Sequence, residues 1–238
     1  MLTGQRLLVT PLIYISAISL LIGNYFSQAL HAQTAQDGEI LALLIKSAKE
    51  QGQMELRLDA PIIMETGLKT VDELSSEYNW LRFHVVDIWV TVKRNHIGTW
   101  YKVRIDEPVK WQGFSASSKP PAGSLPGRLG IDPKNEGLIF QHGGELVIDG
   151  ITIRQPLSNS GFRLQMNKSY LGSFYNDSDS LLLSPAAGIA SLFEVKDGLI
   201  TAVGPTDHPI AKSMRSIYAN DYRAFVSDVT TKVRPLKP

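Results

Sequence analysis

Apolar and polar residues alternate most regularly in residues 145–154, on both sides of the pair Asp149-Gly150. An Asp-Gly pair between alternating apolar residues predicts a β-hairpin with a two-residue type I′ turn, in which both central residues have positive φ. This turn fixes the register, so that one face packs into a core and the other faces water. The predicted pairs are Ile148 with Ile151, Val147 with Thr152, Leu146 with Ile153 and Glu145 with Arg154.

Further alternating segments predict more strands. Residues 80–92 are rich in β-branched and aromatic side chains, and the alternation changes phase at Val85 and Val86, which predicts a bulge there. Residues 99–107 alternate cleanly up to Pro108, which predicts the end of a strand or an edge position. A second hairpin is predicted at Asp197-Gly198 by the same reasoning, with Val195 opposite Ile200 and Phe193 opposite Ala202.

Helical periodicity occurs near both ends of the chain. Residues 37–52 predict a helix capped by Asp37, with an apolar face of Ile40, Leu41, Leu44, Ile45 and Ala48. Near the C-terminus, Asp207 and Asn220 are the predicted caps of two further helices. Thr70 followed by Glu73 has the spacing of a capping box.

These elements together predict a mainly β fold. The sheet is expected to be antiparallel, either a partly open barrel of the OB or netrin type or a β-sandwich, with helices at both ends. The predicted organisation is a signal peptide over residues 1–32, a helix over 37–52, a β domain over 53–205 and a helical segment over 206–233. Within the β domain, residues 112–137 are rich in Pro, Gly and Ser and predict a long loop.

The first residues have the layout of a secretory signal peptide. Arg6 precedes an apolar run over residues 7–22, and the small residues Ser27 and Ala29 suit cleavage after Ala29. Cleavage after Ala32 is the alternative, with the larger Leu30 three residues before the cut. The alternative is an uncleaved membrane anchor, although the run is short for a spanning helix and Pro11 interrupts it. We therefore expect a periplasmic or extracellular protein, which contacts the membrane only through this segment if cleavage fails.

Charge and cysteine content narrow the function. The chain has 24 basic and 23 acidic residues, and loss of Arg6 with the signal peptide leaves 23 of each. Nucleic-acid partners usually require a basic excess, so this class is disfavoured. The absence of cysteine excludes disulfides and thiolate metal sites.

No sequence motif indicates catalysis. The histidines lack zinc-ligand spacing, and His84 within a strand is interpreted as a structural sheet residue. His142-Gly143-Gly144 is similar to a lipase oxyanion loop, but the Gly-x-Ser-x-Gly nucleophile turn is missing, so these glycines are interpreted as the entry to the hairpin. We predict no catalytic residue, no metal site and no cofactor.

Aromatic side chains near the long loop are the best candidates for binding. Trp100 lies on the polar face of its strand, opposite in parity to Tyr101, and Trp111 stands at the entrance to the loop. An amphipathic aromatic residue beside a loop suits contact with a sugar, peptide or protein, although helices could equally cover it. The predicted binding residues are Trp100, Trp111, Arg128 and His142.

The chain contains four distinctive blocks, at residues 99–105, 143–150, 170–174 and 188–195. Together they resemble an uncharacterised family of exported bacterial proteins, over a stretch of about 82–203. The third block departs from the Tyr-Leu-x-Phe pattern of that family through Gly172-Ser173. The block order is also loosely similar to netrin-like OB barrels such as the metalloprotease-inhibitor domain, which are rich in cysteine. The resemblance implies an architecture and no activity.

The sequence therefore favours a non-catalytic periplasmic binding or interaction module. Its expected partners are an envelope protein or a cell-wall glycan. The alternative is a hydrolase whose site is assembled only in the folded protein.

Overall fold

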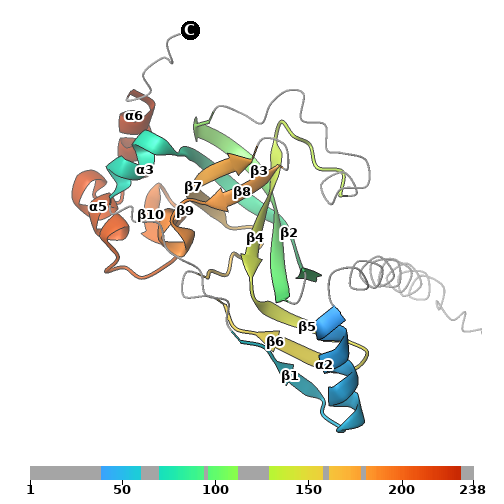
Figure 1. Cartoon of the computed structure of the whole chain (residues 1–238). Coiled ribbons are helices and arrows are strands. Elements are labelled where there is room, and N and C mark those ends of the chain that lie inside the picture. Colours follow the sequence, from blue (N-terminus) through green and yellow to red (C-terminus); the bar gives the residue numbers. More distant parts are fainter. Residues whose placement is uncertain are drawn as a thin grey trace, which may run out of the picture.

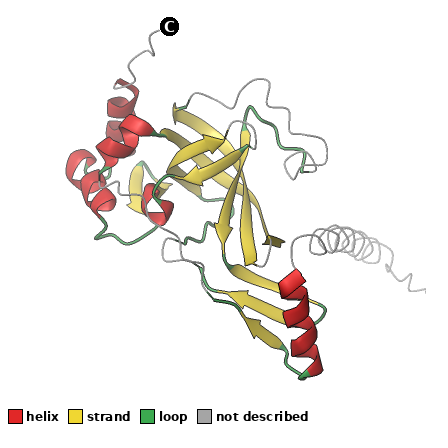
Figure 2. Ribbon diagram, viewed as in Figure 1, coloured by secondary structure: helices red, strands yellow, loops and turns green. Residues whose placement is uncertain are grey.

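The computed structural model describes residues 39–59, 70–93, 96–111, 129–157, 161–177 and 181–231. These residues form a mainly β protein, with a large mixed sheet, a small separate sheet and flanking helices (Figures 1 and 2). The predicted mainly β class with helices near both ends is therefore confirmed.

The large sheet has seven strands. Its strands are antiparallel except for β4 and β8, which are parallel and share the single pair Leu138 and Leu182. The expectation of a wholly antiparallel sheet is therefore wrong. Strand β8 also pairs with β7, but one residue pair between β4 and β8 does not make a closed barrel. In spatial order the strands are β10 (Leu199–Ala202), β9 (Leu192–Lys196), β7 (Ser169–Asp177), β2 (Asn79–Lys93), β3 (His96–Lys110), β4 (Glu136–His142) and β8 (Leu182–Pro185).

Strands β2 and β3 form a long hairpin whose register shifts three times. One shift lies between Val85 and Asp87, so the predicted bulge is confirmed. Strand β3 does not end at Pro108 but continues to Lys110, because a further shift beside Pro108 accommodates a residue that cannot donate a ladder hydrogen bond. The loop predicted to extend to residue 137 ends earlier, since β4 begins at Glu136.

The 145–154 hairpin forms with the predicted register, but in the small sheet. Asp149 and Gly150 have φ of 53° and 81°, as a type I′ turn requires. Arg154 Nε lies 2.8 Å from Glu145 Oε2, so the predicted ion pair is also present. The hairpin consists of β5 (Gly144–Ile148) and β6 (Ile151–Gln155), and β6 pairs in parallel with β1 (Glu55–Arg57).

Helix α2 (Glu39–Glu50) packs on this small sheet and on the tip of the β2–β3 hairpin. Leu41, Ile45 and Ala48 are buried there, but Ile40 and Leu44 are exposed, so the buried face is narrower than predicted. The cap Asp37 lies outside the described residues. The other members of this core cluster are Val92, Ile97, Ile151 and Ile153.

The second hairpin is confirmed as well. Asp197 and Gly198 have φ of 53° and 79°, and β9 and β10 pair in the predicted register. The backbone N–H of Tyr222 donates to Gly198 O at 2.9 Å, and that of Ile200 donates to Asn220 O at 2.8 Å. This hairpin is therefore tied to the segment that enters the last helix.

Helices α3 (Val71–Glu77), α5 (Pro209–Tyr218) and α6 (Tyr222–Thr231) form a layer beside β9 and β10 (Figure 1). The Thr70 and Glu73 capping box is present in α3. The caps of the last two helices differ from prediction by one residue: His208 Nδ1 accepts from Ile210 N, and Asp221 Oδ1 accepts from Ala224 N. A short 3-10 helix (Gly188–Ser191) precedes β9.

The helical layer covers part of one face of the large sheet. Trp80 of β2, Leu171 of β7 and Phe193 of β9 are buried in the same cluster as Met214 of α5 and Phe225 of α6. The opposite face buries Phe83, Tyr101 and Phe174 in a second cluster. The helical layer covers β2 only as far as Trp80. The next residues of β2 on the same face therefore lie at the edge of the layer.

The predicted signal peptide, residues 1–32, lies outside the described residues. In the described part of the chain, every helix is too short or too polar to span a bilayer.

Candidate functional site

Trp100 lies in a row of three aromatic side chains that crosses β2, β3 and β4. Trp89 pairs with Trp100 across β2 and β3, and Trp100 pairs with Phe140 across β3 and β4. The Trp89 and Trp100 rings are nearly parallel with centroids 6.4 Å apart, and Phe140 is 4.7 Å from Trp100. Trp100 Nε1 donates to Thr91 Oγ1 at 2.9 Å. All three rings are half-buried, so much of their apolar surface serves packing.

His142 lies at the end of this row. Its ring meets the Phe140 ring edge-to-face at 4.9 Å, and the His96 ring at 6.3 Å. His96 Nδ1 lies in turn 3.0 Å from Gln155 Nε2 of the small sheet. The structure thus brings Trp100 and His142 into one aromatic cluster through Phe140.

The other two predicted binding residues are Trp111 and Arg128. Trp111 directly follows the last residue of β3, at the opposite end of that strand from His96, and is half-buried against the large core. Arg128 lies outside the described residues. The four predicted residues therefore do not form one described site.

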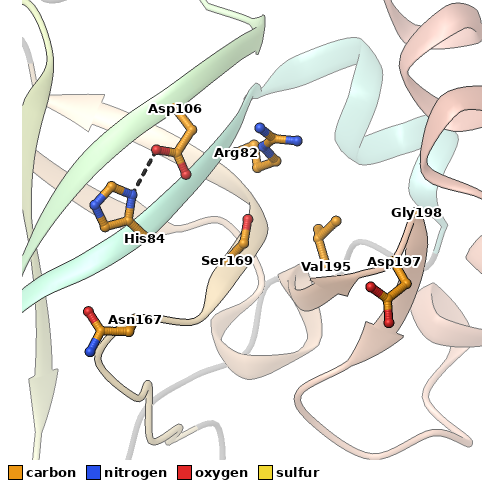
Figure 3. A pocket seen from close by; sticks show the side chains of 8 residues that line it. All are labelled: Arg82, His84, Asp106, Asn167, Ser169, Val195, Asp197 and Gly198. Carbon is orange, nitrogen blue, oxygen red and sulfur yellow. Dashed lines mark hydrogen bonds and ion pairs between the residues drawn. The ribbon is translucent and has the colours of Figure 1, made fainter.

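A polar pocket opens at the border of the helical layer, with a volume of about 570 Å³ (Figure 3). It lies over the four neighbouring strands β3, β2, β7 and β9. Asp106 belongs to β3, His84 of β2 pairs with Ser169 of β7, and Ser169 pairs with Val195 of β9. The turn between β9 and β10 forms one side. The lining residues are Arg82, His84, Asp106, Asn167, Ser169, Val195, Asp197 and Gly198.

A bulge in β3 builds the acidic side of the pocket. Arg82 pairs with Glu107 but Phe83 pairs with Ile105, so Asp106 is an extra residue in β3. A bulge changes the direction in which side chains point, and here the consecutive acids Asp106 and Glu107 both reach the face of the sheet that carries Arg82 and His84. His84 Nδ1 lies 2.7 Å from Asp106 Oδ1. Because a carboxylate only accepts, the pair fixes the orientation of the imidazole ring.

Arg82 is held from the other side by helix α6. Its guanidinium carbon lies 5.5 Å from the centre of the Tyr222 ring. Arg82 Nη1 is 3.7 Å from Glu107 Oε2, which is longer than a direct hydrogen bond. Glu107 accepts instead from the Tyr222 hydroxyl at 2.7 Å. Burial, and then this carboxylate, raise the pKa of Tyr222, which keeps its hydroxyl protonated and donating.

Several polar groups of the pocket remain available for a ligand. The side chains of Asn167, Ser169 and Asp197 make no hydrogen bond or ion pair with any described residue. The buried Nε of Arg82 likewise has no hydrogen-bond partner in the described ranges. The pocket therefore offers donors and acceptors, with charges of both signs.

Serine, histidine and aspartate in one pocket raise the question of nucleophilic catalysis. In a Ser-His-Asp triad, one ring nitrogen meets the aspartate and the other meets the serine. His84 meets Asp106 through Nδ1, but its second ring nitrogen points away from Ser169 (Figure 3). The arrangement is therefore that of an oriented histidine beside a serine, without the hydrogen bond that would activate the hydroxyl.

The pocket does not have the composition of a metal centre. Among the described residues, no group of three or more His, Asp or Glu side chains is placed to hold a metal ion. Arg82, which cannot be deprotonated in proteins, lies beside His84, the only imidazole of the lining. Its positive charge would repel a divalent metal ion bound there.

The pocket was missed by sequence reasoning, which interpreted His84 as a structural residue. One signal was present: Arg82 and His84 share parity in β2, just as Lys102 and Arg104 do on the polar face of β3. The bulge at Asp106 leaves no comparable signal, because residues 99–107 alternate without a change of phase.

Comparisons with protein-family models, with curated proteins and with solved structures each found no match. The resemblance to an exported bacterial family therefore stays a prediction.

Proposed function

We propose that this protein is an exported, non-catalytic binding module whose ligand occupies the pocket beside the helical layer. The observation that carries the proposal is the set of available polar groups in that pocket, contributed by Arg82, Asn167, Ser169 and Asp197. A volume of about 570 Å³ falls in the range of small-molecule sites, so a cell-wall fragment fits better than the surface of a whole envelope protein.

The rigidity of the lining supports binding. Three of the charged or imidazole groups, Arg82, His84 and Asp106, stand on paired strands rather than on loops. Side chains on paired strands lose little freedom when a ligand binds, which favours affinity. The aromatic cluster of Trp89, Trp100, Phe140 and His142 lies farther along the same face of β2 and β3, and would contact only a longer ligand.

The finer architecture is also a proposal. We favour a partly open barrel over a sandwich, because the strand pairings run from β7 through β2, β3 and β4 to β8 and return to β7. The weak link is β4 to β8, which has one residue pair. OB-type barrels are partly open in this way.

Export is proposed from the signal-peptide pattern, with an uncleaved anchor as the alternative. Cleavage would leave a mature chain that begins after Ala29 or Ala32. Cell fractionation followed by N-terminal sequencing separates the two cases. Recovery of the uncut chain from the cytoplasm would contradict export.

Binding is tested by calorimetric titration of the mature protein with a muramidase digest of cell wall. We expect saturable binding, and at least about a tenfold loss of affinity for Arg82→Gln, because a charge-assisted hydrogen bond is removed. Arg57→Gln is the matched control, since Arg57 is an exposed arginine of the small sheet, remote from the pocket lining. No binding, or equal losses in both variants, would contradict the proposal.

A hydrolase is the second candidate, favoured by Ser169, His84 and Asp106 in one pocket. It requires the His84 ring to turn so that a nitrogen reaches Ser169. Turnover of ester or peptide substrates that disappears in Ser169→Ala would establish it against the binding module.

A further inference from the structure

We infer that the pocket takes a zwitterionic ligand of the size of a short peptide, with its carboxylate on Arg82 and its ammonium group at Asp197. This inference rests on the proposed function and adds the chemical class of the ligand. Asp197 lies in the turn that bounds one side of the pocket and Arg82 stands on β2, with Val195 between the two charged side chains (Figure 3).

Arg82 is suited to an anion because its one ion pair, with Glu107, is longer than a hydrogen bond and both nearby acids make shorter contacts with other groups. Asp106 lies 2.7 Å from His84 Nδ1, and Glu107 accepts from the Tyr222 hydroxyl at 2.7 Å. Glu107 itself stays 3.7 Å from the guanidinium. A guanidinium has five donors in a planar fork that matches a carboxylate, and the Tyr222 ring beneath it limits its rotation.

Asp197 is suited to a cation for the corresponding reason. It occupies the first central position of a type I′ turn, with φ of 53°, where its side chain is exposed. Within the described part of the chain it forms no ion pair, and Lys168, beside the lining residues Asn167 and Ser169 in the chain, is bonded to Glu194 at 2.9 Å. Its carboxylate is therefore free to accept from an ammonium group.

Tyr222 fixes the spacing between the two charges. Its ring lies beneath Arg82, while its backbone N–H donates to Gly198 O at 2.9 Å, in the turn that carries Asp197. One residue at the start of α6 thus contacts both ends of the pocket. Between those ends the half-buried Val195 offers an apolar contact, and Ser169 of the same lining offers a hydroxyl to a peptide group.

The test titrates the mature protein with three probes: dialanine, N-acetyl-dialanine, which lacks the ammonium group, and dialanine amide, which lacks the carboxylate. Dialanine should bind best, and each analogue should lose on the order of ten- to a hundredfold in affinity, the effect of one charge-assisted hydrogen bond.

Two variants assign the ends of the ligand. Asp197→Asn should weaken dialanine and leave N-acetyl-dialanine unchanged, and Arg82→Gln should weaken dialanine and leave the amide unchanged. Asparagine tolerates positive φ and forms the same turn, so the first variant keeps the fold. Unchanged melting temperatures verify this for both variants.

Three results would overturn the inference: equal affinity for dialanine and its N-acetyl analogue, no effect of Asp197→Asn on dialanine, or no binding of any peptide probe. If a neutral cell-wall disaccharide binds with a dependence on Arg82 while dialanine does not, the zwitterion fails and the binding module stands. If the cell-wall digest also fails to bind, both proposals fall.

Discussion

At the scale of single residues, Gly98 shows how closely the aromatic row is packed. A Cβ at this position would lie 2.0 Å from Phe140 Cε2, far inside van der Waals contact. Gly98 is not among the residues with positive φ, so space rather than backbone conformation requires glycine here. The ring of Phe140 covers the position that a side chain would fill, as aromatic residues do over strand glycines.

Gly98→Ala is therefore expected to displace the Phe140 ring. Overpacking of this kind lowers the free energy of unfolding by about 1–3 kcal/mol. Urea denaturation measures the loss, and near-ultraviolet circular dichroism should weaken as the stack of Trp89 and Trp100 is disturbed. In a Phe140→Leu background the same substitution should cost clearly less. Equal costs in both backgrounds would show that the contact is absent.

The positions of individual residues could be predicted only where apolar and polar residues alternate regularly along a strand. Trp100 lies opposite Tyr101, as predicted, because the alternation in that part of β3 is unbroken. Asp106 follows a register shift, so its partner His84 could not be identified from spacing. The pocket joins residues 82–84, 106, 167–169 and 195–198, and the distances among these segments depend on the fold.

At the scale of elements, the two Asp-Gly hairpins were predicted to the residue because the information is local. Both central φ values are positive in each turn, and the strand pairs follow from them. The helix caps were displaced by one residue, since several polar side chains stand side by side before α5 and α6. The first hairpin belongs to a separate sheet because it pairs with β1. This pairing joins distant parts of the chain, so no local sequence pattern indicates it.

Gly150→Val should destabilise the small sheet. No atom lies within 4 Å of a Cβ built on Gly150, so the expected loss comes from its φ of 81° alone. A β-branched residue in this region costs on the order of 1–3 kcal/mol. Gly150→Asn is the control, because asparagine tolerates positive φ. Thermal melts that place the two variants at the same stability would refute the turn as the cause.

At the scale of the whole molecule, tyrosine hydroxyls are buried in two separate cores. Tyr101 lies in the cluster on one face of the large sheet, and Tyr222 of α6 lies in the cluster between the helical layer and the other face. Burial raises the pKa of Tyr101 from 10.0 to about 12, and burial also raises the pKa of Tyr222. Both faces of the sheet therefore favour the protonated phenol.

This arrangement predicts a loss of stability in alkali. A folded-state pKa above the unfolded value stabilises the protein fully below pH 10, and this contribution is lost as the pH rises from 10 toward 12. Urea denaturation across this range, followed together with tyrosinate absorbance, should show the free energy of unfolding falling. Tyr101→Phe should make the fall less steep. An identical pH profile for this variant would contradict the assignment.

The parallel pairing of β1 with β6 sets an order of events during folding. Glu55 and Arg154, which form an ion pair across these strands, are 99 residues apart, whereas the β5–β6 hairpin closes over a two-residue turn. Contacts between distant residues form late because loop closure must precede them. Strand β1 therefore has no strand partner during synthesis until residue 155 has emerged, and until then helix α2 can pack, among the buried residues of its core cluster, only on Val92 and Ile97 at the tip of the β2–β3 hairpin. Until the β5–β6 hairpin emerges, the part of the Leu41 and Ile45 face that packs on Ile151 and Ile153 stays accessible to chaperones.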